Sequence, residues 1–261
     1  MYVSVIIPTY NRAGTIGRSI ESVLAQTHDK LEVIIIDDGS TDNTEEIVSG
    51  ITDDRLRYIK LESNGGVSKA RNQGVNLAKY DMIAFQDSDD AWRPDKLEKQ
   101  IRRYEESPDA LMVYCAYELH IDNFSVIVPP TRCQSYILDG IIYPYLLEGN
   151  SVGAPTVLME KDVFVGLGGF DVSYPALEDW KLALEVAKKG KISYIDEVLV
   201  DVFRCDSSIG SSLNNYYKAR CKMIAEYMDD MLGFGIFDSV VSNVFRNAED
   251  NEMLDYAKKL L

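Results

Sequence analysis

Apolar and amphipathic segments alternate along residues 1–120 of the chain. Runs rich in Val, Ile, Leu and Phe predict buried strands at 2–7, 31–37, 55–61, 82–85 and 110–119. Between them, apolar positions recur every three or four residues and predict helices at 15–26, 43–51, 66–79 and 94–107. This alternation, with nearly continuous apolar strands, is typical of a parallel sheet covered by helices on both faces. The pattern therefore predicts an α/β fold.

The regular alternation ends near residue 124. The later pattern predicts strands at 124–128, 155–160 and 191–204, and helices at 141–149 and 178–190. Beyond residue 211 it predicts only helices. Thr41 or Asp42 is expected to cap the start of the helix at 43–51. Pro94 is expected to occupy the first turn of the helix at 94–107. The simplest organisation is an α/β domain at 1–210 followed by a helical C-terminal extension at 211–261.

The composition narrows the class of protein. With a net charge of −15 and no Lys/Arg run, binding to nucleic acid through phosphate contacts is not expected. The four cysteines are scattered without a CxxC motif and there are two histidines, which argues against a zinc-binding site. The same pattern favours reduced cysteine thiols, as in a cytoplasmic protein. No apolar run reaches the roughly 18 residues of a membrane span, and the N-terminus reads as a strand. We expect a cytoplasmic protein; peripheral contact with the inner face of a membrane, and an oligomer formed through the C-terminal helices, stay open.

Polar side chains cluster where the predicted strands end. In a parallel α/β sheet, ligands bind at the carboxyl ends of the strands. Isolated residues of these types are often turn or capping residues, so each one alone is weak evidence for a site. The residues at these positions are Thr9, Tyr10 and Asn11 after the first strand, Asp37 and Asp38 after the second, and Ser63 and Asn64 after the third.

The fourth strand ends in three crowded carboxylates, Asp87, Asp89 and Asp90. Carboxylates this close repel one another unless a positive charge lies among them. One helix cap needs one carboxylate, so capping does not account for three. Mg²⁺ and Mn²⁺ prefer oxygen ligands, and Mg²⁺ commonly binds substrate phosphates as well. The cluster therefore predicts a Mg²⁺ or Mn²⁺ site that holds a diphosphate.

Six motifs follow one another over residues 1–205: VSVIIPTYNR, VIIIDDGSTDNT, NGGVSKARNQG, FQDSDDAWRPDKL, GLGGFD and EDWKLALEVAKKGK. In this order and spacing the chain resembles the family 2 glycosyltransferases of the GT-A fold. The resemblance implies an inverting transferase that uses a nucleotide-diphosphate sugar, most commonly a UDP-sugar, and a saccharide or lipid-linked acceptor. It implies a nucleotide-binding half at 1–120 and an acceptor-binding half at 121–210. By analogy, the product would enter a bacterial surface polysaccharide or glycolipid.

The resemblance also implies the residues of the nucleotide-sugar site. Asp38, with Asp37 behind it, would bind the base of the nucleotide. Arg71 matches the arginine of the family's pocket, and Lys69 lies nearby. The other residues implied for nucleotide, sugar or substrate binding are Pro8, Thr9, Tyr10, Asn11, Asn64, Asp87, Ser88, Gly168, Gly169, Phe170, Glu178 and Trp180.

Metal ligands are implied at two places. Asp87 and Asp89 match the family's DxD motif, with Asp89 the expected metal contact and Asp90 its alternative. After the arginine of the last strand, the family often has a histidine, and this chain has Asp206 there. Asp206 is expected to replace it as a direct or water-mediated metal contact, while a loop or helix-cap role fits the sequence equally well.

The base is implied by the motif that begins with Glu178 and Asp179, because the family's aspartate at this place is the base. Inverting transfer needs one group that removes the proton of the acceptor hydroxyl. Both residues fall in the first turn of a predicted helix, where favourable interaction with the helix dipole is an alternative role. The helix end is expected to favour the ionised form of Asp179.

Other classes fit the sequence less well. The chain contains a G-x-S-x-G at 149–153, but a hydrolase elbow needs a preceding strand and a later histidine, and both histidines come earlier. The chain has neither G-x-G-x-x-G nor G-x-x-x-x-G-K-[ST], which weakens the case for dinucleotide oxidoreductases and P-loop enzymes. A nucleotidyltransferase or a non-catalytic nucleotide-sugar binding module remains as an alternative.

Overall fold

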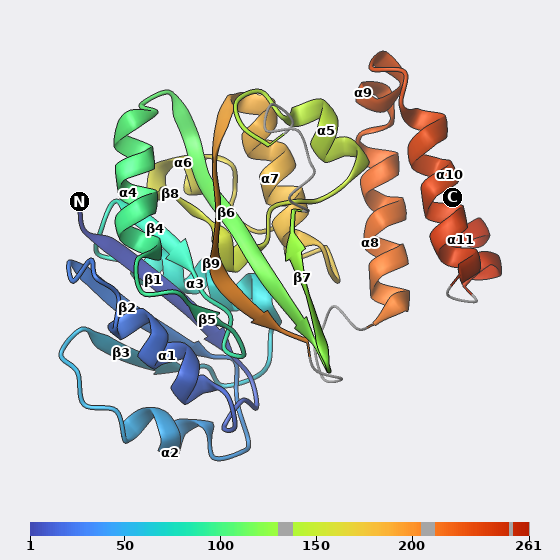
Figure 1. Cartoon of the computed structure of the whole chain (residues 1–261). Coiled ribbons are helices and arrows are strands. Elements are labelled where there is room, and N and C mark those ends of the chain that lie inside the picture. Colours follow the sequence, from blue (N-terminus) through green and yellow to red (C-terminus); the bar gives the residue numbers. More distant parts are fainter. Residues whose placement is uncertain (130–137, 205–211, 251–252, 261) are drawn as a thin grey trace.

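The computed structural model describes residues 1–129, 138–204, 212–250 and 253–260 of the chain. The strands of these residues form one sheet in the order β3-β2-β1-β4-β8-β6-β9-β5, and β7 pairs with the second half of β6 (Figure 1). Their bounds are β1 (Val3–Thr9), β2 (Leu31–Asp37), β3 (Leu56–Lys60), β4 (Met82–Phe85), β5 (Ala91–Trp92), β6 (Ala110–Ile121), β7 (Phe124–Val128), β8 (Leu158–Glu160) and β9 (Lys191–Phe203).

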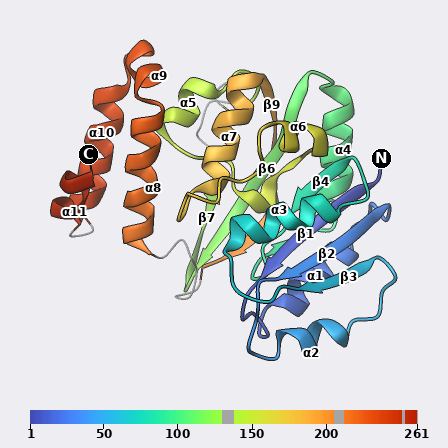
Figure 2. The same ribbon diagram turned by 180° about the vertical axis from the view of Figure 1, so that it is seen from behind.

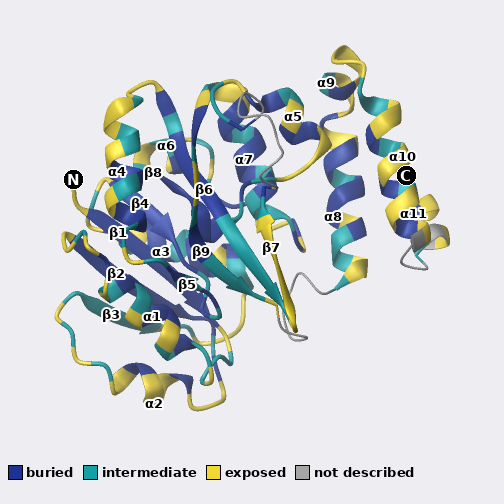
Figure 3. Cartoon of the chain, viewed as in Figure 1, coloured by how far each residue is buried: buried dark blue, intermediate teal, exposed yellow. Residues whose placement is uncertain are grey.

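The sheet is parallel in its first half and mixed in its second half. β1 pairs in parallel with β2 and β4, and β2 pairs in parallel with β3. β8 runs antiparallel to both β4 and β6, whereas β6 and β9 are parallel. Both faces of β1 and β2 are buried, as their continuous apolar runs predicted (Figure 3). The predicted α/β fold with a mostly parallel sheet is confirmed.

Helices cover both faces of this sheet. α1 (Ile16–Leu24), α2 (Thr44–Ser49) and α4 (Lys96–Glu106) cover the face that carries Val3 and Ile7. The opposite face carries Ile6 and Phe85. Because successive side chains of a strand point to opposite faces, β1 supplies both cores. The helices over this second face are α3 (Val67–Leu77), α5 (Tyr143–Glu148), α6 (Lys161–Gly166) and α7 (Glu178–Lys189) (Figure 2).

The C-terminal residues form a helical layer beside α5 and α7 (Figures 1 and 2). Tyr217 and Met223 of this layer are buried in the same apolar core as α7. None of the described helices combines the length and the apolar character that crossing a bilayer requires. The helices of the layer are α8 (Leu213–Glu226), α9 (Met228–Gly233), α10 (Phe237–Asp250) and α11 (Leu254–Leu260).

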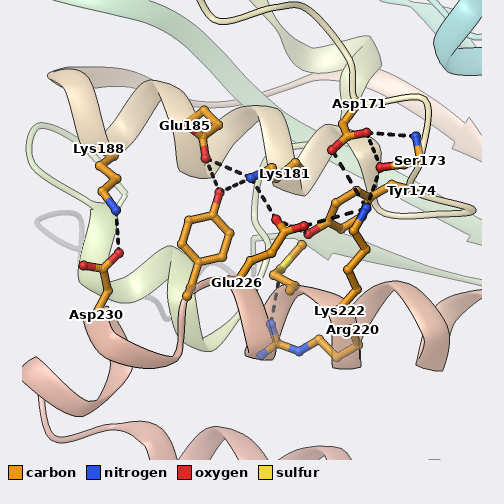
Figure 4. Close-up of polar contacts among 12 residues, drawn as sticks. Asp171, Ser173, Tyr174, Lys181, Glu185, Lys188, Arg220, Lys222, Glu226 and Asp230 are labelled. Atoms are coloured by element: carbon orange, nitrogen blue, oxygen red, sulfur yellow. Dashed lines mark hydrogen bonds and ion pairs between the residues drawn. The ribbon is translucent and has the colours of Figure 1, made fainter. Parts of the chain in front are cut away.

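Ion pairs connect this layer to α7 (Figure 4). Nζ of Lys181 lies 2.9 Å from Glu185 of the same helix and 3.0 Å from Glu226 of α8. About two turns further along α7, Nζ of Lys188 lies 2.7 Å from Asp230 of α9. The helix whose first turn carries the predicted base is therefore fixed along its length by the C-terminal layer.

Two predicted helix starts differ in detail. The helix predicted from Pro94 begins at Lys96, because the carbonyl of Pro94 instead accepts the N–H of Thr27 at 2.8 Å, which holds the proline in the preceding turn. At α2, Asp42 accepts the N–H of Thr44 at 3.0 Å. The aspartate, rather than Thr41, thus satisfies an N-terminal donor of that helix.

The segment predicted as a strand at 155–160 is only partly extended. Its first residues belong to a 3₁₀ helix, Ala154–Thr156, and β8 begins at Leu158. Pro155 has no N–H to donate to a neighbouring strand, which favours the turn. The short strand β5 and the helix α6 were not predicted, because two residues and six residues show no clear period.

Candidate active site

A cavity of about 820 Å³ opens at the carboxyl ends of β1, β2 and β4. In the sheet, β2 lies on one side of β1 and β4 lies on the other. The strand order therefore reverses at β1, and ligands of such sheets usually bind at this point. Most of the predicted site residues line it: Pro8, Thr9, Tyr10, Asn11, Asp38, Asn64, Arg71, Asp87, Ser88, Asp89, Asp90, Glu178 and Asp179.

The loops after β1 and β2 hold each other at the cavity. The N–H of Asn11 donates to Oγ of Ser40 at 2.9 Å, and Oδ1 of Asn11 accepts the N–H of Thr41 at 2.8 Å. Asn11 has a φ of 52°, in the left-handed region that asparagine tolerates better than most residues. Oγ1 of Thr9 is buried and has no hydrogen-bond partner within the described residues, so this hydroxyl remains able to bind a ligand.

The two aspartates at the end of β2 have different surroundings. Asp37 is fully buried, accepts a backbone N–H at 2.7 Å and the hydroxyl of Tyr58, and does not line the cavity. Asp38 lines the cavity and accepts the N–H groups of Gly65 and Gly66 at 2.8 and 2.7 Å. Asp38 therefore fixes the glycine turn before α3 while it faces the space where a ligand would bind.

Arg71 joins two acidic parts of the cavity wall. Its two terminal nitrogens each lie 2.6 Å from a carboxylate, one from Asp87 and the other from Glu178. Burial alone would lower the pKa of Arg71, but these two charges together raise it above its usual value. The ion pairs connect the aspartate-rich loop after β4 to the first turn of α7, so Arg71 sets the distance between them.

The predicted glycines and Phe170 lie behind Arg71 and do not line the cavity. Asn72 exchanges two hydrogen bonds with the backbone of Phe170, at 2.8 and 2.9 Å. Gly168 and Gly169 are both left-handed, and a Cβ at Gly169 would lie 2.7 Å from Oδ1 of Asn72. The ring centroid of Phe170 lies 5.2 Å from the guanidinium of Arg71. Phe170, held by Asn72, therefore packs against the arginine.

The carboxylates after β4 are crowded and enclosed. Burial and the charge of Asp87 raise the pKa of Asp89, although Nε of Arg12 lies 3.4 Å from Asp89. The pKa of Asp90 is raised well above its usual value, first by burial and then by the charges of Asp87 and Asp89. Asp90 also accepts the backbone N–H of Phe203 at 3.0 Å. Negative charge at this cluster is thus under-compensated by the protein.

This surplus of charge fits a divalent cation. Oxygen ligands of this kind suit Mg²⁺ and Mn²⁺. A bound cation would offset the repulsion that, after burial, raises both pKa values. Asp89 and Asp90, whose pKa values are raised, could hold it; Asp87 is paired with Arg71 at 2.6 Å, more closely than Asp89 is with Arg12 at 3.4 Å.

Asp179 lies on the cavity wall in the first turn of α7. Leu177, directly before this helix, is left-handed with a φ of 62°, so the turn into α7 is tightly constrained. Burial and, after it, the charge of Glu178 raise the pKa of Asp179, whereas Arg71 opposes the shift, and the net value is about 7. The helix end alone was expected to favour the ionised form of Asp179; the net pKa is instead above that of a free aspartate, and burial is the largest cause.

A second cluster has the spacing of metal ligands: Glu118, His120 and Asp201, on the outer ends of β6 and β9. The sequence reasoning missed it, although Glu118 and His120 alternate on one face of a predicted strand. Arg93 already lies among these groups, with a terminal nitrogen 2.8 Å from Glu118 and 3.2 Å from Asp201. A hydrogen bond from Ser125 lowers the pKa of Glu118. At Asp201, burial is outweighed by hydrogen bonds from Arg93 and His120, which lower its pKa. The pKa values of Asp89 and Asp90 are instead raised.

Besides Asp37, the two glycines and Phe170, three more predicted residues lie away from the cavity wall or outside the described residues. Lys69 is exposed on α3 and does not line the cavity. Trp180 is buried and donates from its ring nitrogen to the carbonyl of Leu146 at 2.6 Å, which gives it a packing role. Asp206 lies outside the residues that the structure describes.

The cavity also has walls that the sequence reasoning did not single out. Arg12 follows the predicted Asn11 directly, so its position was the readiest to find. Burial and the nearby charges of Asp179 and Asp90 raise the pKa of Tyr117 to about 12. The added lining residues include Arg12, Tyr117, Leu119, Val202, Phe203, Arg204 and Tyr216.

Comparison with known proteins identifies relatives. A family model described as glycosyl transferase family 2 matches residues 4–153. WfgD of Escherichia coli, a UDP-Glc:alpha-D-GlcNAc-diphosphoundecaprenol beta-1,3-glucosyltransferase, is 31% identical over 252 residues, which are 95% of this chain and 96% of WfgD. WfaP of Escherichia coli, whose name describes the same activity, is 32% identical. That match covers 77% of this chain and 76% of WfaP. A longer, uncharacterized glycosyltransferase of Rickettsia felis is 36% identical, and the chain spans 32% of its length.

Solved structures share the fold. TarS of S. aureus, residues 1–349 in complex with UDP-GlcNAc, superposes with a TM-score of 0.73 at 21% identity, over 95% of this chain and 73% of that chain. The mannosyltransferase PcManGT from Pyrobaculum calidifontis, in complex with GDP-Man and Mn²⁺, gives a TM-score of 0.70 at 19% identity. That match covers 99% of this chain and 73% of the other.

Proposed function

Because this chain belongs to glycosyl transferase family 2, we propose that it is an inverting enzyme that moves a sugar from a UDP-sugar to a hydroxyl of a lipid-linked saccharide. That the chain is a glycosyl transfer enzyme follows from its family and its relatives. One observation carries the finer proposal: Asp179 lies on the same cavity wall as the aspartate cluster after β4, and Arg71 spans the two.

Asp179 is proposed as the base. In inverting transfer, one group removes the proton of the acceptor hydroxyl as its oxygen attacks the anomeric carbon from the face opposite the diphosphate. A base works best when its pKa lies near the working pH, and that of Asp179 is raised to about 7. Glu178 is a weaker candidate, because it is held in an ion pair with Arg71.

Asp89 and Asp90 are proposed to hold Mg²⁺ or Mn²⁺. When bound, such an ion neutralises charge on the diphosphate. Around it, Arg12 beside Asp89 and Arg71 beside Asp87 contribute fixed positive charge to an otherwise acidic cavity. Asp206, which lies outside the described residues, remains a proposed additional contact.

The nucleotide is proposed to bind between the loops after β1 and β2. Asp38 offers carboxylate oxygens to the imide N–H of a uracil, and Thr9 offers an unpartnered hydroxyl, judged within the described residues. The choice of UDP follows WfgD and WfaP, whose names give UDP-Glc as donor. The same names give a diphosphoundecaprenol-linked GlcNAc as acceptor, which is why we propose a lipid-linked acceptor and a role in bacterial surface polysaccharide synthesis.

The test is transfer itself. The protein is incubated with UDP-glucose, Mn²⁺ and GlcNAc-diphosphoundecaprenol, with UDP release and the mass of the lipid product both measured. Product formation that requires the acceptor, with β configuration at the new linkage, supports the proposal. UDP-sugar binding without UDP release would indicate a binding module, and formation of a nucleotide-sugar from a sugar phosphate would indicate a nucleotidyltransferase.

A further inference from the structure

The hairpin formed by β6 and β7 has one apolar face and one polar face. Directly opposed residues of an antiparallel pair share a face, and neighbours in a strand alternate. On one face Leu119 pairs with Val126, and Ile121 pairs with Phe124. The other face carries the pairs Glu118 with Ile127 and His120 with Ser125.

The neighbouring strand β9 continues this division. Val202 pairs with Leu119 on the apolar face, and Asp201 pairs with Glu118 on the polar face. Five residues therefore form a continuous apolar surface, which we name the apolar strip: Leu119, Ile121, Phe124, Val126 and Val202.

The apolar strip begins inside the cavity and ends in solvent. Leu119 and Val202 line the cavity. At the other end, the side chains of Phe124 and Val126 are 60% and 43% exposed, and β7 is the most exposed strand of the sheet (Figure 3). Apolar residues exposed together on an edge strand are a liability in a free monomer, so their presence suggests a ligand that covers them.

We propose that the apolar strip binds the hydrocarbon chain of the acceptor. The part of that chain that it binds is the part nearest the acceptor's diphosphate. This inference rests on the proposed function. A glycolipid that presents its sugar hydroxyl to Asp179 has to leave the cavity with its hydrocarbon part, and the apolar strip is a surface continuous with the cavity that suits a hydrocarbon chain.

The length of this surface gives the proposal a measurable scale. Tyr117 also lines the cavity, on the same face as Leu119. From Tyr117 to Ile121 the strand advances by about 14 Å, at about 3.4 Å per residue. Because C–C bonds of about 1.5 Å follow a zigzag, an extended hydrocarbon advances about 1.25 Å per bond, so about eleven bonds, or twelve carbon atoms, span this length. Longer chains are not expected to gain further contact.

The experiment compares two acceptor analogues, GlcNAc diphosphate esterified to ethanol and to dodecanol. Calorimetry measures their affinities with UDP and Mn²⁺ present, and again without them. The wild-type protein is expected to bind the dodecyl ester at least about tenfold more tightly, because buried methylene groups each add to binding. In a double variant, Phe124→Ser with Val126→Thr, most of this preference is expected to disappear. The matched control is Ile127→Thr. Ile127 lies on the polar face of the same strand and is 37% exposed, so this variant is expected to keep the preference for the dodecyl ester.

Three outcomes would overturn the inference. Equal affinity of the wild-type protein for both esters, a preference unchanged in the double variant, or an equal loss in the control each contradict it. If the preference is unchanged and the double variant no longer binds acceptor-free phosphatidylglycerol vesicles, the surface contacts the bilayer instead. Binding of UDP with Mn²⁺ is measured in the same samples, and its absence contradicts the proposed function separately. Circular dichroism confirms that each variant is folded.

Discussion

At the scale of single residues, the chemistry of the cavity depends on a balance of charges around Asp179. Enclosure and the negative charge of Glu178 raise its pKa, while Arg71 lowers it. The net result, a pKa of about 7, keeps a large fraction of Asp179 ionised at neutral pH and makes it a stronger base than a free aspartate.

Replacing Asp179 by Asn removes the proposed base and preserves shape. Loss of a general base commonly costs about 10²–10⁴-fold in rate, so we expect transfer to fall by that factor in steady-state assays of UDP release. The affinity for UDP with Mn²⁺, measured by calorimetry, is expected to stay near that of the wild-type protein. Near-normal turnover of the Asn variant would instead point to Glu178.

The pH dependence offers an independent check. Asp179 acts when ionised, so kcat/KM is expected to rise with pH and level off above about 7. In Glu178→Gln the neighbouring negative charge that raises the pKa of Asp179 is lost. The pKa falls, and the rising limb moves to lower pH. A limb that stays in place would show that it reports another group, and a variant without activity would assign the base to Glu178.

The two acidic clusters are expected to differ in their response to metal. Asp89→Asn removes a proposed ligand, so the affinity for UDP with Mn²⁺ should fall at least about tenfold, since even loss of a supporting residue near a metal costs this much. His120→Gln is the matched control at the second cluster, where Arg93 forms ion pairs with both carboxylates, and it should leave that affinity unchanged. The reverse result would move the metal to Glu118, His120 and Asp201, and equal affinity in EDTA would exclude a metal role.

At the scale of elements, the sequence predicted what local patterns encode. β1, β2 and β4 are continuous apolar runs, and α1 and α3 have clear helical spacing, so each could be recognised alone. The start of α4 was misplaced because Pro94 bonds to Thr27, which is distant in sequence. β5 could not be recognised because it exists only through its pairing with β9.

In the candidate site too, locally encoded residues could be predicted, and residues placed by tertiary contacts could not. Residues at strand ends, such as Thr9 and Asp38, were predictable because parallel strands bring their carboxyl ends together. Tyr216 was not, because α8 reaches the cavity through tertiary packing and lies beyond the family motifs. Phe170 was among the residues expected to bind the substrate, but it does not line the cavity and instead bonds to Asn72 and packs against Arg71. Such contacts depend on side chains far apart in sequence.

A buried cation contributes to the attachment of α8 to α5 and α7. Arg220 is 2% exposed, lies 4.1 Å from the centroid of the Trp180 ring, and donates to the carbonyls of Leu147 and Glu148 at 3.3 and 3.2 Å. Arg220→Met leaves these carbonyls without their donor, so we expect the free energy of unfolding to fall by about 2 kcal/mol in urea titrations.

The control for Arg220 is Lys218→Met, an exposed position on the same helix. It is expected to change the free energy of unfolding by less than about 0.5 kcal/mol, as surface substitutions usually do. Equal effects of the two substitutions would show that Arg220 contributes no more than an exposed residue.

At the scale of the whole molecule, one apolar core runs from the sheet into the C-terminal layer. It contains Phe85 of β4, Leu184 of α7, Tyr217 of α8 and Val244 of α10. The ion pairs of Figure 4 lie along the same boundary. The boundary at residues 210/211, drawn from sequence patterns, therefore separates segments that share a core, and the layer is expected to unfold together with the rest.

Hydrogen exchange tests this cooperativity. A ligand that binds only the folded protein stabilises it by RT ln(1 + [L]/Kd), about 2.7 kcal/mol at a hundredfold excess over Kd. UDP with Mn²⁺ binds, in our proposal, at the ends of β1 and β2, far from α10 in the sequence. If the chain unfolds as one unit, the slowest amides of α10 (Phe237–Asp250) and of β1 should be slowed by the same factor, about a hundredfold. Amides of α10 that exchange equally fast with and without ligand, while those of β1 slow down, would show that the C-terminal layer opens independently.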